Sequence, residues 1–262
     1  MRRPEVKVRL DFTKDMPKKF RTDYKLGNYD PDRIQKIMWK YLVRSVNSER
    51  AWVRLHHHTP ELLSGRKKMK ILEVSTAHGA MLDILRHYGH EVRGTDFNWV
   101  SKAQWDRKIP LTRNWFKQIL YNVSSKSHRN QCKDDVVGWP YQPIIESLDL
   151  DVDIFDGGIL PYSYEDKSFD YVYCYQAIDA FGPADTWIDY ITEFCRIARK
   201  TVVVGFNPLP HENRNDGKDI QIAVDSWKRM QSLTAHSLKT VYFEIGTTGA
   251  GIHPVGMKMM AV

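Results

Sequence analysis

The sequence predicts an α/β protein whose core is a doubly wound, mostly parallel sheet of seven strands. Three observations lead to this fold class: short apolar runs recur along the chain, helix-period segments separate most of them, and the last two runs have no helix between them. Parallel neighbours need a long crossover, usually a helix, whereas antiparallel neighbours need only a turn. We therefore expect an antiparallel C-terminal hairpin on an otherwise parallel sheet.

The first strand, turn and helix are predicted within residues 70–96, KILEVSTAHGAMLDILRHYGHEVRGTD. An apolar run at 71–74 predicts a strand, and small residues at 75–79 predict the turn that follows it. A helix is then indicated by apolar residues at helical spacing: Met81, Leu82, Leu85 and Tyr88. A second strand at 91–94 ends at Asp96. Such a unit suits a nucleotide, because the turn opens the helix N-terminus to a ligand and the acid can accept ribose hydroxyls.

The remaining elements follow the same alternation. Five further strands are predicted at 152–155, 169–175, 201–206, 241–245 and 257–262. Amphipathic helices are predicted at 187–197 and 219–233. The run at 201–206 is apolar throughout, as is typical of a central parallel strand.

Two segments lie outside this pattern. We expect residues 1–65 to form a basic N-terminal helical extension, or lid, on a domain formed by 66–262, with a helical, aromatic-rich insertion at 97–150. Residues 1–70 hold 19 Lys and Arg against 8 Asp and Glu, whereas the remainder holds 20 against 24. This asymmetry is compatible with an anionic partner such as nucleic acid, or with a solvated surface. The insertion is compatible with an acceptor pocket or with aromatic side chains that pack on the sheet.

Composition narrows the class further. No apolar run reaches the roughly 20 residues that span a bilayer, so no transmembrane segment is predicted. The three cysteines, Cys132, Cys174 and Cys195, have no metal-site spacing, which fits a reducing, cytoplasmic location. Three adjacent histidines, His56 to His58, would point about 100° apart on a helix. They therefore cannot share one metal ion, although one of them at a helix end could be functional. We predict no metal site.

Three motifs resemble those of the class I S-adenosylmethionine-dependent methyltransferases. The first is an acid followed by alternating small residues, Glu73-Val-Ser-Thr-Ala-His-Gly79, and the second is Asp96 at the end of the second strand. The third runs from Asp156 through Leu-Pro-Tyr at 160–162 to Ser-Phe-Asp at 168–170. The turn alone also fits a nicotinamide enzyme, but the third motif favours the methyltransferases. The resemblance covers about residues 69–206 and the closing hairpin.

The resemblance implies a role for each matching residue. Glu73 would lie near the methionine end of the cofactor S-adenosylmethionine, Asp96 would accept both ribose hydroxyls, and Asp156 would accept the adenine amino group. Phe97 and Tyr162 would contact the adenine faces. The full set of predicted cofactor-binding residues is Glu73, Ser75, Ala77, Gly79, Asp96, Phe97, Asp156, Gly157, Tyr175 and Gln176. Of these, Tyr175 and Gln176 would border the sulfonium and the acceptor.

Two departures from the family pattern bear on the reaction. Ser75 and Ala77 stand where the family mostly has glycine, so a fold that binds without catalysis is an alternative. Asp179 and His211 follow the fourth and fifth strands, where a general base would sit. We expect O- or N-methylation of a small-molecule, glycan or lipid-precursor acceptor. The alternative acceptor is RNA, bound by the basic extension and by stacking on aromatic side chains of the insertion.

Overall fold

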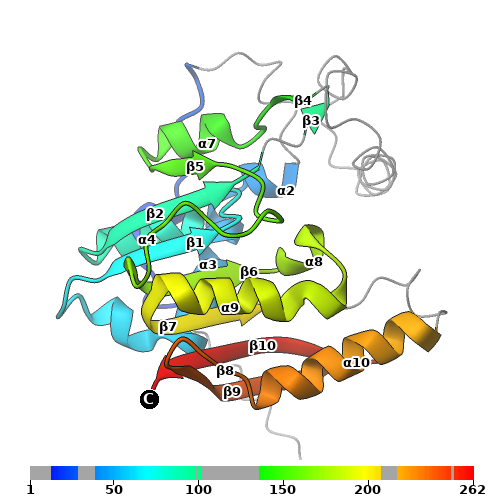
Figure 1. The fold of residues 1–262 in the computed structure, drawn as a ribbon. Coiled ribbons are helices and arrows are strands. Elements are labelled where there is room, and N and C mark those ends of the chain that lie inside the picture. Colours follow the sequence, from blue (N-terminus) through cyan, green and yellow to red (C-terminus); the bar gives the residue numbers. More distant parts are fainter. Residues whose placement is uncertain (1–12, 29–38, 98–99, 102–135, 208–216, 249–250) are drawn as a thin grey trace, which may run out of the picture.

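A computed structural model describes residues 13–28, 39–97, 100–101, 136–207, 217–248 and 251–262 (Figure 1). Its centre is an eight-stranded sheet in the order β5-β2-β1-β6-β7-β10-β9-β8. The strands are β1 (Lys70–Val74), β2 (Glu91–Asp96), β5 (Val152–Ile154), β6 (Phe169–Tyr175), β7 (Ala198–Gly205), β8 (Thr234–Ala235), β9 (Leu238–Thr248) and β10 (Gly251–Ala261). β3 (Val100–Ser101) and β4 (Val136–Gly138) form a separate antiparallel pair.

The predicted fold class is confirmed, with one correction to the number of strands. Strands β5, β2, β1, β6 and β7 are parallel, and β10 pairs antiparallel with both β7 and β9. The prediction of seven strands was wrong because β8 has two residues, too few for a periodic signal. It joins β9 through a two-residue turn at His236 and Ser237, whose φ angles are 47° and 67°. Such turns usually contain Asn or Gly, which this turn lacks.

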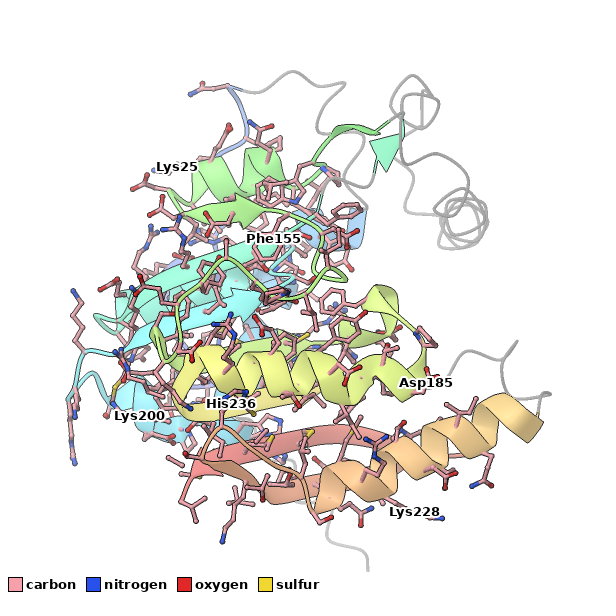
Figure 2. All side chains as sticks on the ribbon, in the orientation of Figure 1. Lys25, Phe155, Asp185, Lys200, Lys228 and His236 are labelled. Carbon is pink, nitrogen blue, oxygen red and sulfur yellow. The ribbon has the colours of Figure 1, made fainter. Side chains whose placement is uncertain are left out.

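Helices cover both faces of the sheet. They are α2 (Trp39–Leu42), α3 (Arg44–His58), α4 (Ala80–His87), α7 (Gln142–Ser147), α8 (Ile178–Phe181), α9 (Trp187–Ile197) and α10 (Gly217–Gln231), with 3-10 turns η1 (Lys18–Arg21), η2 (Pro60–Ser64) and η3 (Ala184–Thr186). In Figure 1, α9 and α10 lie in front of the sheet, and α3 and α4 lie behind it. Side chains fill the layers between the helices and the sheet (Figure 2).

The face behind the sheet is closed by the N-terminal extension as well as by α4. Phe20, Trp52 and Leu55 from the extension are buried in one cluster with Ile71 of β1 and Met81 of α4. Arg44 at the start of α3 also forms an ion pair with Asp83 of α4, at 2.7 Å. The described part of the extension therefore shares its core with the sheet.

Part of the insertion packs beside the first unit of the sheet. Trp139, Ile144 and Leu150 form a buried cluster with Leu82 of α4. The helix predicted at 111–121 lies outside the described residues. None of the helices in the described ranges combines the length and the apolar composition that a membrane-spanning helix needs.

Candidate functional site

The C-terminal ends of the parallel strands lie together at one edge of the sheet. We call this edge the carboxyl edge; it is formed by the ends of β1, β2, β5, β6 and β7. In Figure 2, Lys200 lies near the opposite edge, and Asp185 lies beyond the carboxyl edge. The chain leaves β1 toward β2 on one side and later returns as β6 on the other side. Open α/β sheets bind ligands at such a switch point, outside the carboxyl ends of the strands.

The turn after β1 has three residues in the left-handed conformation. The φ angles are 58° at Ser75, 48° at Ala77 and 67° at Gly79. Two of these residues carry a Cβ, which costs roughly 1–2 kcal/mol each in this region. The backbone is held there because the Thr76 amide donates to the Thr95 carbonyl at 2.8 Å. The turn thus keeps, with Ser and Ala, a path that glycine adopts more easily.

Gly79 is required by packing as well as by its φ angle. A Cβ at this position would lie 2.6 Å from Leu150 Cδ1 and 2.7 Å from Ile145 Cδ1. The start of α4 is therefore packed against the segment that contains α7 and leads to β5. At this glycine, the close approach is to the protein's own side chains.

The Asp96 carboxylate fixes the turn to the end of β2. Its Oδ2 accepts hydrogen bonds from the Ala77 amide at 3.1 Å and from Trp139 Nε1 at 2.9 Å, and its Oδ1 accepts one from the Phe97 amide at 2.8 Å. Three hydrogen bonds of this kind hold the carboxylate in one orientation. Asp96 is buried beside Trp139, whereas Phe97 is 39% exposed.

Glu73 is a buried acid at the end of β1. Burial raises its pKa to about 7, and the Thr76 hydroxyl and the positive charge of Arg54 oppose that rise. The hydroxyl of Thr76 donates to Glu73 Oε2 at 2.5 Å. Glu73 is therefore poised to change its protonation state when a nearby charge changes.

Arg54, a residue that the sequence did not single out, lies against the end of β6. Its guanidinium lies 4.8 Å from the centroid of the Tyr175 ring and donates to Gln176 Oε1. Burial lowers the pKa of Arg54, but guanidinium remains cationic in proteins. Within the described residues, the Tyr175 hydroxyl is buried and has no hydrogen-bond partner. A Cβ at position 205 would lie 2.3 Å from this ring, so Gly205 is what lets Tyr175 lie over β7.

The segment after β5 is a tight turn. Asp156 Oδ1 accepts a hydrogen bond from the Gly158 amide at 2.9 Å, which forms an Asx turn. The carbonyl of buried Gly157 accepts one from the Tyr162 hydroxyl at 2.8 Å. Tyr162 itself is 4% exposed and packs against Phe155. This ring is thus part of the hydrophobic core.

The two predicted base candidates have different outcomes. Asp179 Oδ1 accepts a hydrogen bond from Asn207 Nδ2 at 2.9 Å, and the same amide nitrogen donates to the Gln176 carbonyl at 2.9 Å. Asn207 therefore ties the segments that follow β6 and β7 to each other. His211 lies outside the described residues. No cluster of three or more metal-ligating side chains occurs in the ranges that the structure describes.

Sequence reasoning did not find Arg54, Trp139 and Asn207 as members of the site. Arg54 is one of many cations in the extension, and Trp139 is one of many aromatic residues in the insertion. Neither has a local motif, because tertiary packing alone brings each to the carboxyl edge. Asn207 directly follows a central strand at this edge, which is a positional signal that could have identified it.

Comparison with known proteins gives similarity at the level of solved structures only. Neither protein-family models nor curated proteins match the chain. It is similar to magnesium protoporphyrin IX methyltransferase from Synechocystis PCC 6803 with bound SAM, at 12% identity and a TM-score of 0.42, over 84% of this chain and 82% of that one. It is also similar to a TehB-like SAM-dependent methyltransferase from Corynebacterium glutamicum ATCC 13032, at 13% identity and a TM-score of 0.40, over 80% and 95% of the two chains. At this level of likeness, neither structure assigns an activity to the chain.

Proposed function

We propose that the chain binds S-adenosylmethionine at the carboxyl edge and transfers its methyl group to a small-molecule acceptor. The observation that carries the proposal is the group of polar side chains around the ends of β1 and β6. Glu73 is a buried acid, Arg54 is a half-buried cation, and the Tyr175 hydroxyl is buried without a partner among the described residues. Such a set suits a zwitterion, with one charge of each sign and one hydroxyl.

The amino-acid end of S-adenosylmethionine is a zwitterion of this kind. Arg54 would pair with its α-carboxylate, Glu73 would accept its α-ammonium, and the Tyr175 hydroxyl would gain a partner. Asp96, beside the turn, would accept the ribose hydroxyls, as the sequence resemblance implies. When bound, the cofactor supplies an activated methyl group, so the protein's own part is chiefly to position it and to exclude water.

A small acceptor is favoured over RNA because two of the three arginines of α3 contact the protein itself. Arg44 is paired with Asp83, and Arg54 donates to Gln176 at the end of β6, whereas Arg50 is exposed. Nucleic-acid binding instead needs cations that face a partner's phosphates. The turn also keeps its left-handed conformation at Ser75 and Ala77, although neither residue is glycine. This favours a protein that still binds the cofactor over one that no longer does.

Two ligands test the adenosine end and the amino-acid end of the proposed site independently. S-adenosylhomocysteine, the cofactor's product, carries both adenosine and the amino acid, whereas 5′-methylthioadenosine lacks the amino acid. We would titrate both by calorimetry into wild type, Arg54→Met and Asp96→Asn. The matched control is Arg50→Met, which removes the same charge from an exposed position on the same helix.

The expected pattern is selective. Arg54→Met lowers the affinity for S-adenosylhomocysteine by roughly 10- to 100-fold, which is the contribution of a hydrogen-bonded charge pair. It leaves the affinity for 5′-methylthioadenosine unchanged. Asp96→Asn lowers the affinity for both ligands, and Arg50→Met lowers the affinity for neither. Wild type that binds neither ligand would refute the proposal. Equal weakening of both ligands by Arg54→Met would refute the carboxylate assignment and leave adenosine binding intact.

A further inference from the structure

A second polar cluster lies beside the first one, between α3 and the closing hairpin. His57 Nε2 lies 3.0 Å from the Tyr242 hydroxyl and 3.1 Å from Glu244 Oε2. The Tyr242 hydroxyl donates to the same Glu244 oxygen at 2.7 Å. We call these three residues the His57 cluster. The middle of the three adjacent histidines in the sequence is thus held by two side chains of β9.

The contacts of the His57 cluster determine which ring nitrogen carries the proton. An ionised carboxylate only accepts hydrogen bonds, and the Tyr242 hydroxyl already donates its one hydrogen bond to Glu244. Both groups near Nε2 are therefore acceptors, so Nε2 carries the hydrogen in the neutral ring. The lone pair is then on Nδ1, as in other carboxylate–histidine pairs, where the hydrogen bond to one nitrogen fixes the state of the other.

The charge states of the neighbours agree with this arrangement. The hydrogen bond from Tyr242, followed by the bond from His57, holds the pKa of Glu244 below its usual value. Burial, together with the bond to Glu244, raises the pKa of Tyr242 to about 12. At neutral pH, Glu244 is therefore ionised and Tyr242 is protonated.

Strand register places the His57 cluster at the carboxyl edge. Gly256 of β10 pairs with Gly205, the last residue of β7, and also with Glu244. Glu244 is therefore level with the end of β7, at the same edge of the sheet as the proposed cofactor site at the ends of β1 and β6. A second histidine links the two sites, because the His58 ring lies 4.4 Å from that of His57 and 5.8 Å from that of Tyr175.

His58 cannot itself carry the charge. It is 8% exposed, and burial, followed by the positive charge of His57, lowers its pKa to about 4. The cations Lys258 and Arg54 act in the same direction on it. By contrast, the His57 side chain is 48% exposed and pairs with a carboxylate. Of the two rings, His57 is therefore the one that is open to a ligand and to solvent.

We infer that His57 is the general base for methyl transfer, and that the acceptor is a phenol or an enol whose hydroxyl it deprotonates. This inference rests on the proposed function. As the acceptor oxygen forms its bond to the methyl carbon, its proton moves to Nδ1 of His57. The electron pair of the broken carbon–sulfur bond stays on the sulfur, and His57 later loses the proton to solvent. Glu244 and Tyr242 are positioning residues.

The substrate class follows from the matching of acid and base. General-base catalysis is effective when the two pKa values are close. Phenols, with a pKa of about 10 as in tyrosine, lie within a few decades of imidazole at about 6.5, whereas aliphatic alcohols lie much further away. The surroundings fit a planar acceptor as well, since the centroid of the His58 ring lies 5.8 Å from that of Tyr175 and 5.9 Å from that of Tyr242.

The test uses 4-nitrophenol as the acceptor probe, because its phenolate is yellow and its neutral form is not. The probe is added to the full chain saturated with S-adenosylhomocysteine, at a pH where the free phenol is mostly un-ionised. The variants are His57→Gln and Glu244→Gln. The matched control is His87→Gln, which removes an exposed histidine from α4.

Wild type and His87→Gln should bind the probe and increase its ionised fraction. His57→Gln should remove this increase, and Glu244→Gln should reduce it at least severalfold, with S-adenosylhomocysteine affinity unchanged in both. Equal ionisation in His57→Gln, or no binding of the probe to wild type, would overturn the inference. Failure of wild type to bind S-adenosylhomocysteine would instead show that the underlying function is wrong. Unchanged affinity for that ligand also reports that each variant is folded.

Discussion

Replacing Glu73 with glutamine should stabilise the protein, and the gain should depend on pH. Glu73 is 7% exposed, and its pKa is raised from 4.5 to about 7 by burial. In the unfolded chain this carboxyl ionises freely, whereas in the folded protein its ionisation is opposed. A glutamine side chain here would have nearly the same shape and could still accept the Thr76 hydroxyl bond, but it would carry no charge. The comparison therefore isolates the ionisation.

The sign and size follow from linkage. A carboxyl with a raised folded pKa favours the folded state at low pH. That advantage is complete below the unfolded pKa of 4.5 and is lost as the pH rises through about 7. At about 1.4 kcal/mol for each decade, wild type should lose about 3 kcal/mol relative to Glu73→Gln across this window. Above about pH 8, the difference should be constant.

Urea unfolding of both proteins at a series of pH values measures this difference directly. A difference in unfolding free energy that changes by less than about 1 kcal/mol between pH 4.5 and 8 would refute the reasoning. A second readout connects the buried acid to the ligand. If the α-ammonium of S-adenosylhomocysteine pairs with Glu73, binding at about pH 6 must release a proton from wild type. The calorimetric heat would then vary with the ionisation enthalpy of the buffer, and in Glu73→Gln that variation would disappear.

Two further predictions concern the turn and the extension. Ser75→Gly and Ala77→Gly should each raise the free energy of unfolding by about 1 kcal/mol, because glycine adopts a positive φ without strain. The control, Ala223→Gly within α10, should lower the free energy of unfolding by about 1 kcal/mol. If Ser75→Gly and Ala77→Gly also lowered it, the left-handed conformation of the turn would be contradicted. Leu55→Ala should cost about 3 kcal/mol in a single unfolding transition, because Leu55 is fully buried in the core shared with β1. Val53→Ala, at a position 42% exposed on the same helix, should change the free energy by less than about 0.5 kcal/mol, and a separate transition for the extension in Leu55→Ala would show that it folds independently.

The sheet was largely predictable because its strands are apolar runs in a regular alternation with helices. The predicted boundaries at 169–175 and 187–197 are those of β6 and α9. The eighth strand was missed since two residues carry no period. The resemblance to the methyltransferase motifs, placed on this alternation, gave Glu73, Asp96 and Tyr175 as candidates at one edge. What these side chains do at that edge depends on neighbours that the pattern does not identify.

The neighbours come from parts of the chain distant in sequence. Arg54 approaches Gln176 across 122 positions, and His57 approaches Glu244 across 187. No local rule links such residues, because their contact depends on how α3 packs against the sheet. The three histidines show the same limit: their spacing excluded a shared metal ion, but only β9 distinguishes His57 from its neighbours.

The two ends of the proposed reaction are therefore held by two different parts of the molecule. The adenosine end would be bound by Asp96 and the turn, which the parallel strands and α4 position rigidly. The methionine end and the acceptor would be bound by α3, through Arg54 on one turn and His57 on the next. Residues three apart lie on the same side of a helix, so a single packed helix aligns the cofactor's charged end with the base. A change in how α3 packs should accordingly alter both cofactor affinity and proton transfer, whereas a change at Asp96 should alter the first alone.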